Sequence, residues 1–231
     1  MKKLLKYFSV GEIALWLSSV AVIIISFCIF DRESYLTLAA SIVGVTALII
    51  CAKGNPIGQV FMIIFCILYG IISLSFSYYG ELITYTCMSL PMAVFSLISW
   101  LRNPYKGERA EVKTNRPGKK EIFIMLGVTA VVTFLFYFIL KYFGTANLLP
   151  STLSVTTSFF AAYLSFRRSP YFAFVYALND IVLIILWTLA AFTDITYISV
   201  IICFTVFLVN DLHGFFSWKR MEKRQRMPEE P

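Results

Sequence analysis

The chain has 231 residues, of which 59% are hydrophobic and only 14% are charged, and its mean hydropathy is +0.78. A water-soluble domain carries a far more charged surface, so this composition excludes that class and places most of the chain in lipid. The formal net charge is +7. No nucleic-acid recognition motif accompanies this charge, and we therefore expect no nucleic-acid partner.

Apolar windows follow one another along the chain, and each is close to the length of about 20 residues that a membrane-spanning helix needs. Their hydrophobic runs are continuous rather than alternating, which predicts helices and excludes a barrel. The first window has a basic start like a signal peptide, but no small-residue cleavage site follows before Asp31, so we expect a span. Eight spans are predicted, at 11–30, 35–52, 57–77, 81–101, 121–143, 149–166, 171–193 and 195–218.

The basic residues gather on one side of the predicted membrane. Every Lys and Arg except Arg32 and Lys141 lies before the first span, after the last, or in the loops that follow spans two, four and six. The positive-inside rule makes this side cytoplasmic and predicts that both termini lie there. Anionic lipid headgroups are sufficient partners for these clusters.

Two stretches of the chain resemble each other. Ser-Trp-x-Arg occurs at 99–102 and again at 217–220, and the turns KGNP at 53–56 and RRSP at 167–170 correspond. Two parallel repeats need one helix between them to return the chain, which predicts a 3+1+3 core. The alternative is that Trp and Arg only mark a membrane interface. The predicted units are a leading helix (1–34), a first three-helix repeat (35–102), a cytoplasmic basic loop (103–120), a linker helix (121–147), a second repeat (148–219) and a cytoplasmic tail (220–231).

Polar side chains inside the spans are the candidate binding residues. Ionisable groups at bilayer depth are costly unless they face protein or water. Helical spacing puts Tyr176, Asn179, Asp180 and Trp187 on one face of the seventh span, and Asn210 shares a face with the only histidine, His213, in the eighth. An aromatic face with amides and a carboxylate suits an aromatic base that carries a hydroxylated sugar. A satisfied interhelical hydrogen-bond network is the alternative. Asp211 and Trp218 lie close to the inner interface, where anchoring roles are common.

Three motifs occur together and in order: YYGE at 78–81, SWLRNPYKG at 99–107 and VNDLHGFFSWKRM at 209–221. With them, residues 35–221 resemble the PnuC family of bacterial vitamin transporters. The resemblance implies an all-α membrane protein with a 3+1+3 fold related to the sugar-exporting SWEET proteins, assembled as a homotrimer. It also implies facilitated diffusion of nicotinamide riboside, a precursor for NAD biosynthesis, with inward flux maintained by an intracellular kinase. Relatives in the wider family carry thiamine, riboflavin or deoxynucleosides, and these alternatives stay open.

The resemblance also implies which positions contact the substrate. They are Trp187 and Asn179 in the seventh span, Asn210 in the eighth, and Gln59 with Tyr69 in the third. The pattern of polar residues adds Asp180, Tyr176 and His213 to this set. The chain departs from the family at two points: Trp187 stands alone where several members have WxxW, and His213 replaces an expected tyrosine.

A membrane enzyme is the main rival class, and it would need a nucleophile with its base, paired carboxylates or a metal cluster. One histidine, no HExxH motif and no cysteine pair argue against it, and all five cysteines fall inside apolar windows. We therefore expect no cofactor, metal or disulfide. A scaffold that binds without transporting is the second rival, and vesicle uptake separates the two.

Overall fold

The computed structural model describes residues 7–75 and 79–227, apart from the side chains of residues 108 and 109. Lys2, Lys3 and Lys6, the predicted end of the third span at 76–77 and residues 228–231 of the predicted tail lie outside this part. The described elements are α2 (Val10–Phe30), α3 (Tyr35–Ala52), α4 (Ile57–Ser75), α5 (Tyr79–Ile83), the π-helix η1 (Thr84–Ser89), α6 (Leu90–Arg102), β1 (Pro104–Tyr105), β2 (Glu108–Val112), α7 (Lys119–Tyr142), α8 (Leu148–Phe166), α9 (Phe172–Ala191), the 3-10 helix η2 (Ile195–Tyr197) and α10 (Ile198–Arg226).

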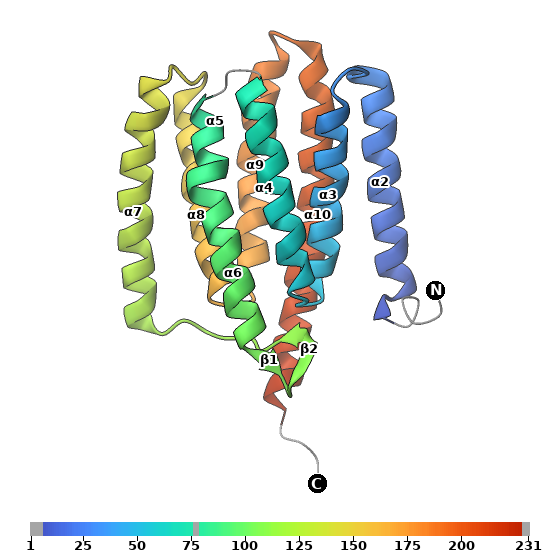
Figure 1. Ribbon diagram of the computed structural model, residues 1–231, viewed down its shortest axis with the longest axis vertical. Helices are drawn as coiled ribbons and strands as arrows, with labels where there is room; N and C mark the ends of the chain where they lie inside the picture. Colours follow the sequence, from blue (N-terminus) through green and yellow to red (C-terminus); the bar gives the residue numbers. More distant parts are fainter. Residues whose placement is uncertain (1–6, 76–78, 228–231) are drawn as a thin grey trace.

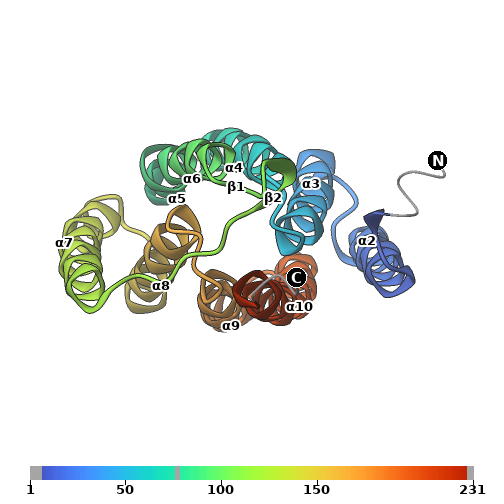
Figure 2. The ribbon, with the colours of Figure 1, turned by 90° about the horizontal axis from the view of Figure 1, so that it is seen from below.

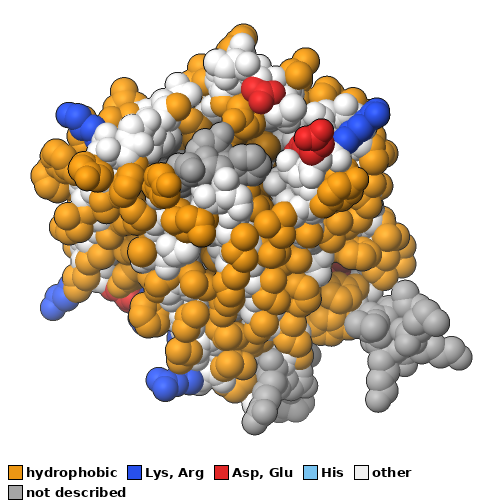
Figure 3. Space-filling view, turned by 45° about the horizontal axis from the view of Figure 1, so that its top comes forward, with side chains coloured by type: hydrophobic (Ala, Val, Ile, Leu, Met, Phe, Trp, Pro, Cys, Tyr) orange, Lys and Arg blue, Asp and Glu red, His pale blue; other side chains and the backbone are white. Residues whose placement is uncertain are grey.

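The long helices stand side by side and run up and down along one axis (Figure 1). Within the described residues, seven helical segments are long and apolar enough to cross a membrane, and α5, η1 and α6 together form one of them. Seen along the axis, α7, α8, α9 and α10 follow one side of the bundle, α4 and α6 lie across from them, and α2 is at one edge (Figure 2). On the face drawn in Figure 3, hydrophobic side chains cover the flank and the charged ones lie toward the ends. The chain is a multi-pass membrane protein.

The predicted sixth span corresponds to α8, which is not among the seven apolar segments. Its sequence is rich in hydroxyl side chains, which lowers its hydropathy. It packs against both α7 and α9, and Thr156 Oγ1 is 2.9 Å from Thr133 Oγ1 of α7. Hydroxyl groups at such helix contacts bond to neighbours instead of facing lipid. The helix therefore belongs to the bundle although its composition is less apolar.

The π-helical turn has a cause in the sequence. Pro91 follows at the start of α6, and proline has no backbone N–H for a carbonyl one turn earlier. The backbone N–H of Leu90 instead bonds to Tyr85 O, five residues back. Such π-turns rotate the side chains that precede them relative to a regular helix and often lie at functional sites. Here the turn places Tyr85 toward the centre of the bundle.

The first helices of the two predicted repeats, α3 and α8, end in the same way. The φ angle of Gly54 is +68° and that of Arg168 is +57°, so both helices end in a left-handed residue. The backbone N–H of Gly54 bonds to Cys51 O at 2.9 Å, and that of Arg168 bonds to Ser165 O at 2.9 Å. These turns correspond to the KGNP and RRSP segments of the sequence.

The Ser-Trp pairs bind these helix ends reciprocally. Trp218 Nε1 donates to Cys51 O at 2.8 Å, and Trp100 Nε1 donates to Ser165 O at 2.9 Å. Their serine neighbours each donate to the next carbonyl of the same helix at 2.7 Å: Ser217 to Ala52 O and Ser99 to Phe166 O. The two indole rings are fully buried and lie 5.2 Å apart between centroids. The end of α10 thus holds the end of α3, and the end of α6 holds the end of α8.

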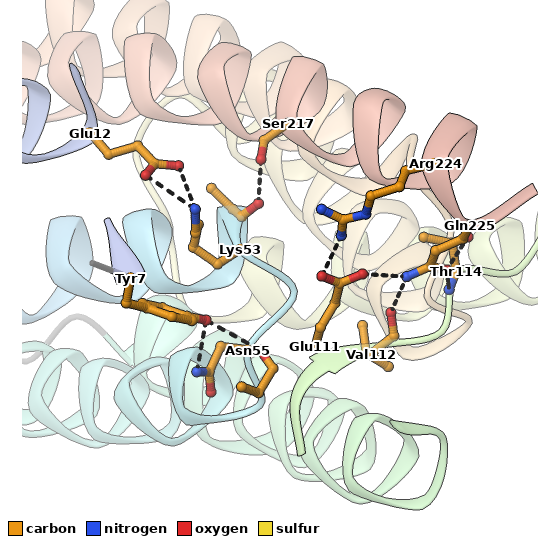
Figure 4. Close-up of polar contacts among 12 residues, drawn as sticks. Tyr7, Glu12, Lys53, Asn55, Glu111, Val112, Thr114, Ser217, Arg224 and Gln225 are labelled. Carbon is orange, nitrogen blue, oxygen red and sulfur yellow. Dashed lines mark hydrogen bonds and ion pairs between the residues drawn. The ribbon is translucent and has the colours of Figure 1, made fainter. Parts of the chain in front are cut away.

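The leading helix α2 is attached to this core by polar contacts. Ser9 and Glu12 form a capping box at its start, with bonds of 3.2 and 2.7 Å. The Glu12 carboxylate also pairs with Lys53 at the end of α3 (3.2 Å), as Figure 4 shows. Higher on the helix, Trp16 Nε1 donates to Thr46 Oγ1 at 3.1 Å. These contacts hold α2 against α3.

The predicted basic loop at 103–120 contains a short antiparallel hairpin, β1 with β2, that the sequence analysis did not predict. Lys106 and Gly107 connect the strands with φ angles of 50° and 79°. Positive φ at both central residues is the type I′ turn of a two-residue hairpin. Glycine adopts this conformation without strain. The strands are short and contain few apolar residues, so the alternating hydrophobic pattern typical of a strand is not visible in the sequence.

The hairpin joins two distant parts of the chain at the end of the bundle where α3, α6 and α8 finish, hereafter the basic end. Val112 N donates to Gly54 O at 2.9 Å, and Gln225 Nε2 near the end of α10 donates to Val112 O at 3.0 Å. Arg224 pairs with Glu111, which also accepts from Gln225 Nε2 at 2.8 Å (Figure 4). The hairpin therefore bridges the turn after α3 and the tail of α10.

Candidate functional site

A cavity of about 160 Å³ lies inside the bundle, between helices α3 to α6 and helices α8 to α10. Its lining comes from α3, α4, α5, η1, α6, α8, α9 and α10, with Leu140 of α7 at one side. No residue of α2 contributes to it. Sites enclosed by helices of a bundle, mostly apolar with a few polar groups, are typical for small ligands.

Aromatic side chains form much of the wall. Trp187 of α9 lines the cavity and packs on Tyr197 with ring centroids 5.1 Å apart. Tyr69 of α4 and Tyr85 of η1 also line the cavity, with ring centroids 5.0 Å apart. The Trp187 Nε1 atom is buried and has no hydrogen-bond partner among the described residues. The wall thus offers aromatic faces and one unused N–H donor.

Two amides supply directional polar groups. Asn179 Oδ1 accepts from Ser154 Oγ at 3.3 Å and Thr157 Oγ1 at 2.8 Å, and in the described part of the chain its Nδ2 donates to no protein group. Gln59 Nε2 donates to Ser165 Oγ at 3.3 Å, so its orientation leaves Oε1 as the acceptor. One amide therefore presents a donor and the other an acceptor, both from deeply buried positions.

A pair of carboxyl groups lies in the same cavity. Asp180 of α9 is 4% exposed and Asp211 of α10 is 5% exposed. The two carboxyl groups lie close enough to interact, and Asp180 Oδ2 has no hydrogen-bond partner in the described residues. A third acid, Glu81 of α5, lines the cavity as well.

The charged side chains in the described lining of the cavity are all acidic. No Lys, Arg or His is among the described residues that line it. Within residues 7–75 and 79–227, no group of three or more His, Cys, Asp or Glu could hold a metal ion. The described lining of the cavity therefore presents acidic groups without a basic counterpart.

Six residues predicted from the sequence line this cavity, which brings together side chains of α4 and α9: Gln59, Tyr69, Tyr176, Asn179, Asp180 and Trp187. The other two predicted residues, Asn210 and His213, do not line it. Asn210 is 1% exposed and donates to Ser19 Oγ of α2 at 2.9 Å. His213 Nε2 lies 3.9 Å from Glu12 Oε1, also on α2.

This placement corrects the expectation that the polar face of the last helix borders the cavity. Successive residues of an α-helix point about 100° apart, so only part of a polar cluster faces one direction. On α10 the residue that faces the cavity is Asp211, whereas Asn210 and His213 turn toward the leading helix. Asp211 was expected to anchor the helix at the interface, and it instead meets Asp180.

Sequence reasoning also missed Glu81, Thr84, Tyr85 and Ser89, which line the cavity from α5 and η1. Their spacing does not follow one face of a regular α-helix because the π-turn intervenes. The available signal was Pro91, which follows the polar stretch Thr84–Tyr85–Thr86 by about one helical turn.

Comparison with known proteins identifies relatives of this chain. A family model described as nicotinamide mononucleotide transporter matches residues 34–220. A nicotinamide riboside transporter PnuC of Neisseria mucosa is 24% identical over 200 residues, which cover 85% of this chain and 76% of that protein. The corresponding PnuC of Haemophilus influenzae is 24% identical over 193 residues, covering 83% of this chain and 82% of that protein.

A solved structure has the same fold. The crystal structure of the vitamin B3 transporter PnuC aligns with a TM-score of 0.80 and covers 94% of each chain at 22% sequence identity. The helices of the bundle therefore follow the architecture of that transporter. These relatives are transporters and not enzymes.

Proposed function

Because the chain belongs to the nicotinamide mononucleotide transporter family, we propose that it takes up nicotinamide riboside across the bacterial plasma membrane. The support comes from relatives named nicotinamide riboside transporters that align over most of both chains. The observation that carries the proposal is the buried cavity between the two three-helix units, with aromatic walls and two oriented amides.

The proposed binding mode follows from the groups in the cavity. The pyridine ring stacks beside Trp187, because flat π-faces attract each other and exclude water. The ribose hydroxyls are both donors and acceptors, which matches the free N–H of Asn179 and the free carbonyl oxygen of Gln59. Tyr69, Tyr176 and Asp180 complete the wall around the sugar.

The charge of the cavity favours the riboside over its phosphorylated form. A phosphate is normally bound by Arg or Lys through short, charge-assisted hydrogen bonds. The described lining contains acids and no basic residue. A mononucleotide would therefore place its phosphate near Asp180 and Asp211 with no cation to balance the charge.

We propose a transport cycle in which the two units rock against each other around this cavity. The reciprocal contacts of Trp100 and Trp218 support a core of two parallel repeats joined by α7. The basic end faces the cytoplasm, by the positive-inside rule. The flux is facilitated diffusion, and an intracellular kinase that phosphorylates the substrate keeps it inward, because the phosphorylated product no longer fits the cavity.

The proposed assembly is a homotrimer, as the family resemblance implies. Each chain contains a complete cavity, so every protomer transports independently. Chemical cross-linking of the protein in its native membrane tests this state, and a ladder that stops at three subunits is expected. Species that stop at two would contradict it.

Uptake into liposomes tests the function. Purified protein is reconstituted, and radiolabelled nicotinamide riboside uptake is measured against unlabelled nicotinamide riboside, its mononucleotide, thiamine, riboflavin and a deoxynucleoside. Only nicotinamide riboside should compete strongly, and uptake should stop at equal concentrations inside and outside. Enclosed kinase and ATP should then produce accumulation as the mononucleotide, whereas proton and sodium ionophores should change nothing.

Other outcomes identify the rival functions. Stronger competition by thiamine, riboflavin or the deoxynucleoside would reassign the substrate within the family. Binding without any uptake would indicate a scaffold. Chemical conversion of the substrate in liposomes that contain no kinase would indicate an enzyme.

A further inference from the structure

We infer that the Asp180–Asp211 pair makes the cavity selective for substrates that carry a positive charge on their aromatic ring. The inference rests on the proposed function, because the pair belongs to the same cavity. It deepens that function by naming the charge that a substrate must carry. It also assigns a recognition role to Asp211, which sequence reasoning placed at the membrane interface.

The first support is the environment of the two carboxyl groups. Both are about 95% buried, and within the described residues neither has a salt bridge to Lys, Arg or His. A negative charge is costly in such a place unless a positive charge accompanies it. Asp180 lines the cavity and its Oδ2 atom has no hydrogen-bond partner in the described residues, so a ligand can supply the accompanying positive charge.

The second support is the chemistry of the candidate substrates. In nicotinamide riboside the sugar is attached to the pyridine nitrogen, so the ring carries a permanent positive charge. Thiamine carries a permanent charge on its thiazolium ring, whereas riboflavin and deoxynucleosides are neutral at pH 7. An acidic pair therefore divides the substrates of the wider family into two groups and favours the cationic one.

The third support is the position of the pair relative to Trp187. Asp180 lies two helical turns before Trp187 on α9, about 10 Å along the helix axis. A ring beside Trp187 with its sugar directed toward Asn179 places the charged nitrogen on the side of the acids. At about 10 Å and an effective dielectric constant of about 20, one charge pair favours binding roughly fifteenfold.

The test compares two ligands that differ in charge. Calorimetry on the purified full-length protein measures the Kd of nicotinamide riboside and of its reduced dihydropyridine form, which keeps the amide and ribose but is neutral. We expect the cation to bind at least about tenfold more tightly, which corresponds to ~1.4 kcal/mol. Equal affinities would overturn the inference, and this comparison needs no variant.

Variants then assign the preference to the pair. Asp180→Asn with Asp211→Asn keeps the shape and hydrogen-bonding capacity of both groups and removes the acids. The tenfold preference should disappear, while Glu33→Gln, an exposed acid outside the cavity, should retain it. A preference that persists in the double variant would assign the pair a purely structural role and overturn the inference.

A thiamine arm separates this inference from the proposed substrate. If thiamine binds and nicotinamide riboside does not, the substrate is wrong while selection for a cation stands. If nicotinamide riboside binds no more tightly than its neutral form, the substrate stands and the inference fails. Preferred binding of riboflavin or a deoxynucleoside would overturn both.

Discussion

Replacing Trp218 with phenylalanine tests the reciprocal junction between the two predicted three-helix repeats. Trp218 is fully buried and its indole N–H reaches across to Cys51 O of α3 at 2.8 Å. If the units are true repeats, Trp100→Phe on the other unit should have the same effect, because Trp100 makes the equivalent bond to Ser165 O at 2.9 Å. The prediction is that both substitutions lower stability by similar amounts.

The magnitude follows from the contacts that are lost. A net intramolecular hydrogen bond contributes about 1 kcal/mol. The Cys51 carbonyl keeps its bond from Gly54 N, so no orphaned acceptor adds to the cost. Shrinking a fully buried indole to a phenyl ring leaves a small void that costs on the order of 1–2 kcal/mol. Each substitution should thus destabilise by about 2–3 kcal/mol, or lower Tm by about 5–10 °C.

The assay is thermal unfolding in detergent, followed by circular dichroism, for both single variants and the double variant. The two rings lie 5.2 Å apart. Aromatic pairs of this kind couple by about 0.5–1.5 kcal/mol, so the double variant should fall short of the summed effects. Trp16→Phe, which removes a half-buried indole bond to Thr46, is the control and should cost about 1 kcal/mol. Destabilisation by one junction variant only, or strict additivity of the two, would refute the reciprocal arrangement.

Three further substitutions address the cavity, the packing of the core and the leading helix. Trp187→Ala should raise the Kd for nicotinamide riboside about 5- to 150-fold through the loss of stacking and abolish saturable uptake, while membrane insertion is unchanged; unchanged uptake would remove Trp187 from the site. Gly58→Ala should lower the free energy of unfolding by about 1–3 kcal/mol, because the added Cβ would lie 2.7 Å from the backbone N of Cys51. A Tm equal to that of the native protein would contradict the tight contact between α3 and α4. Asn210→Leu should leave ligand affinity within about twofold, since its partner is Ser19 of α2, and should lower thermal stability by about 1 kcal/mol; a large loss of affinity would place Asn210 at the substrate.

The sequence alone determined the membrane character, the approximate position of the spans and one face of the central cavity. Hydrophobic windows separated by basic loops locate the helices because lipid requires long apolar segments. Helical periodicity placed Tyr176, Asn179, Asp180 and Trp187 on one side of α9, and the structure directs that side into the cavity. Neighbours within one helix have a geometry that local spacing already determines.

The tertiary structure decided which helix faces meet. Asn210 and Asp211 are adjacent in α10 and look equally polar in the sequence. In the structure Asn210 faces α2, whereas Asp211 lies near Asp180 of α9. The tertiary structure also rotated Tyr85 into the cavity through a π-turn and formed a hairpin in the basic loop. The rotation of each helix about its axis depends on how all its neighbours pack, and this information is spread over residues far apart in the chain.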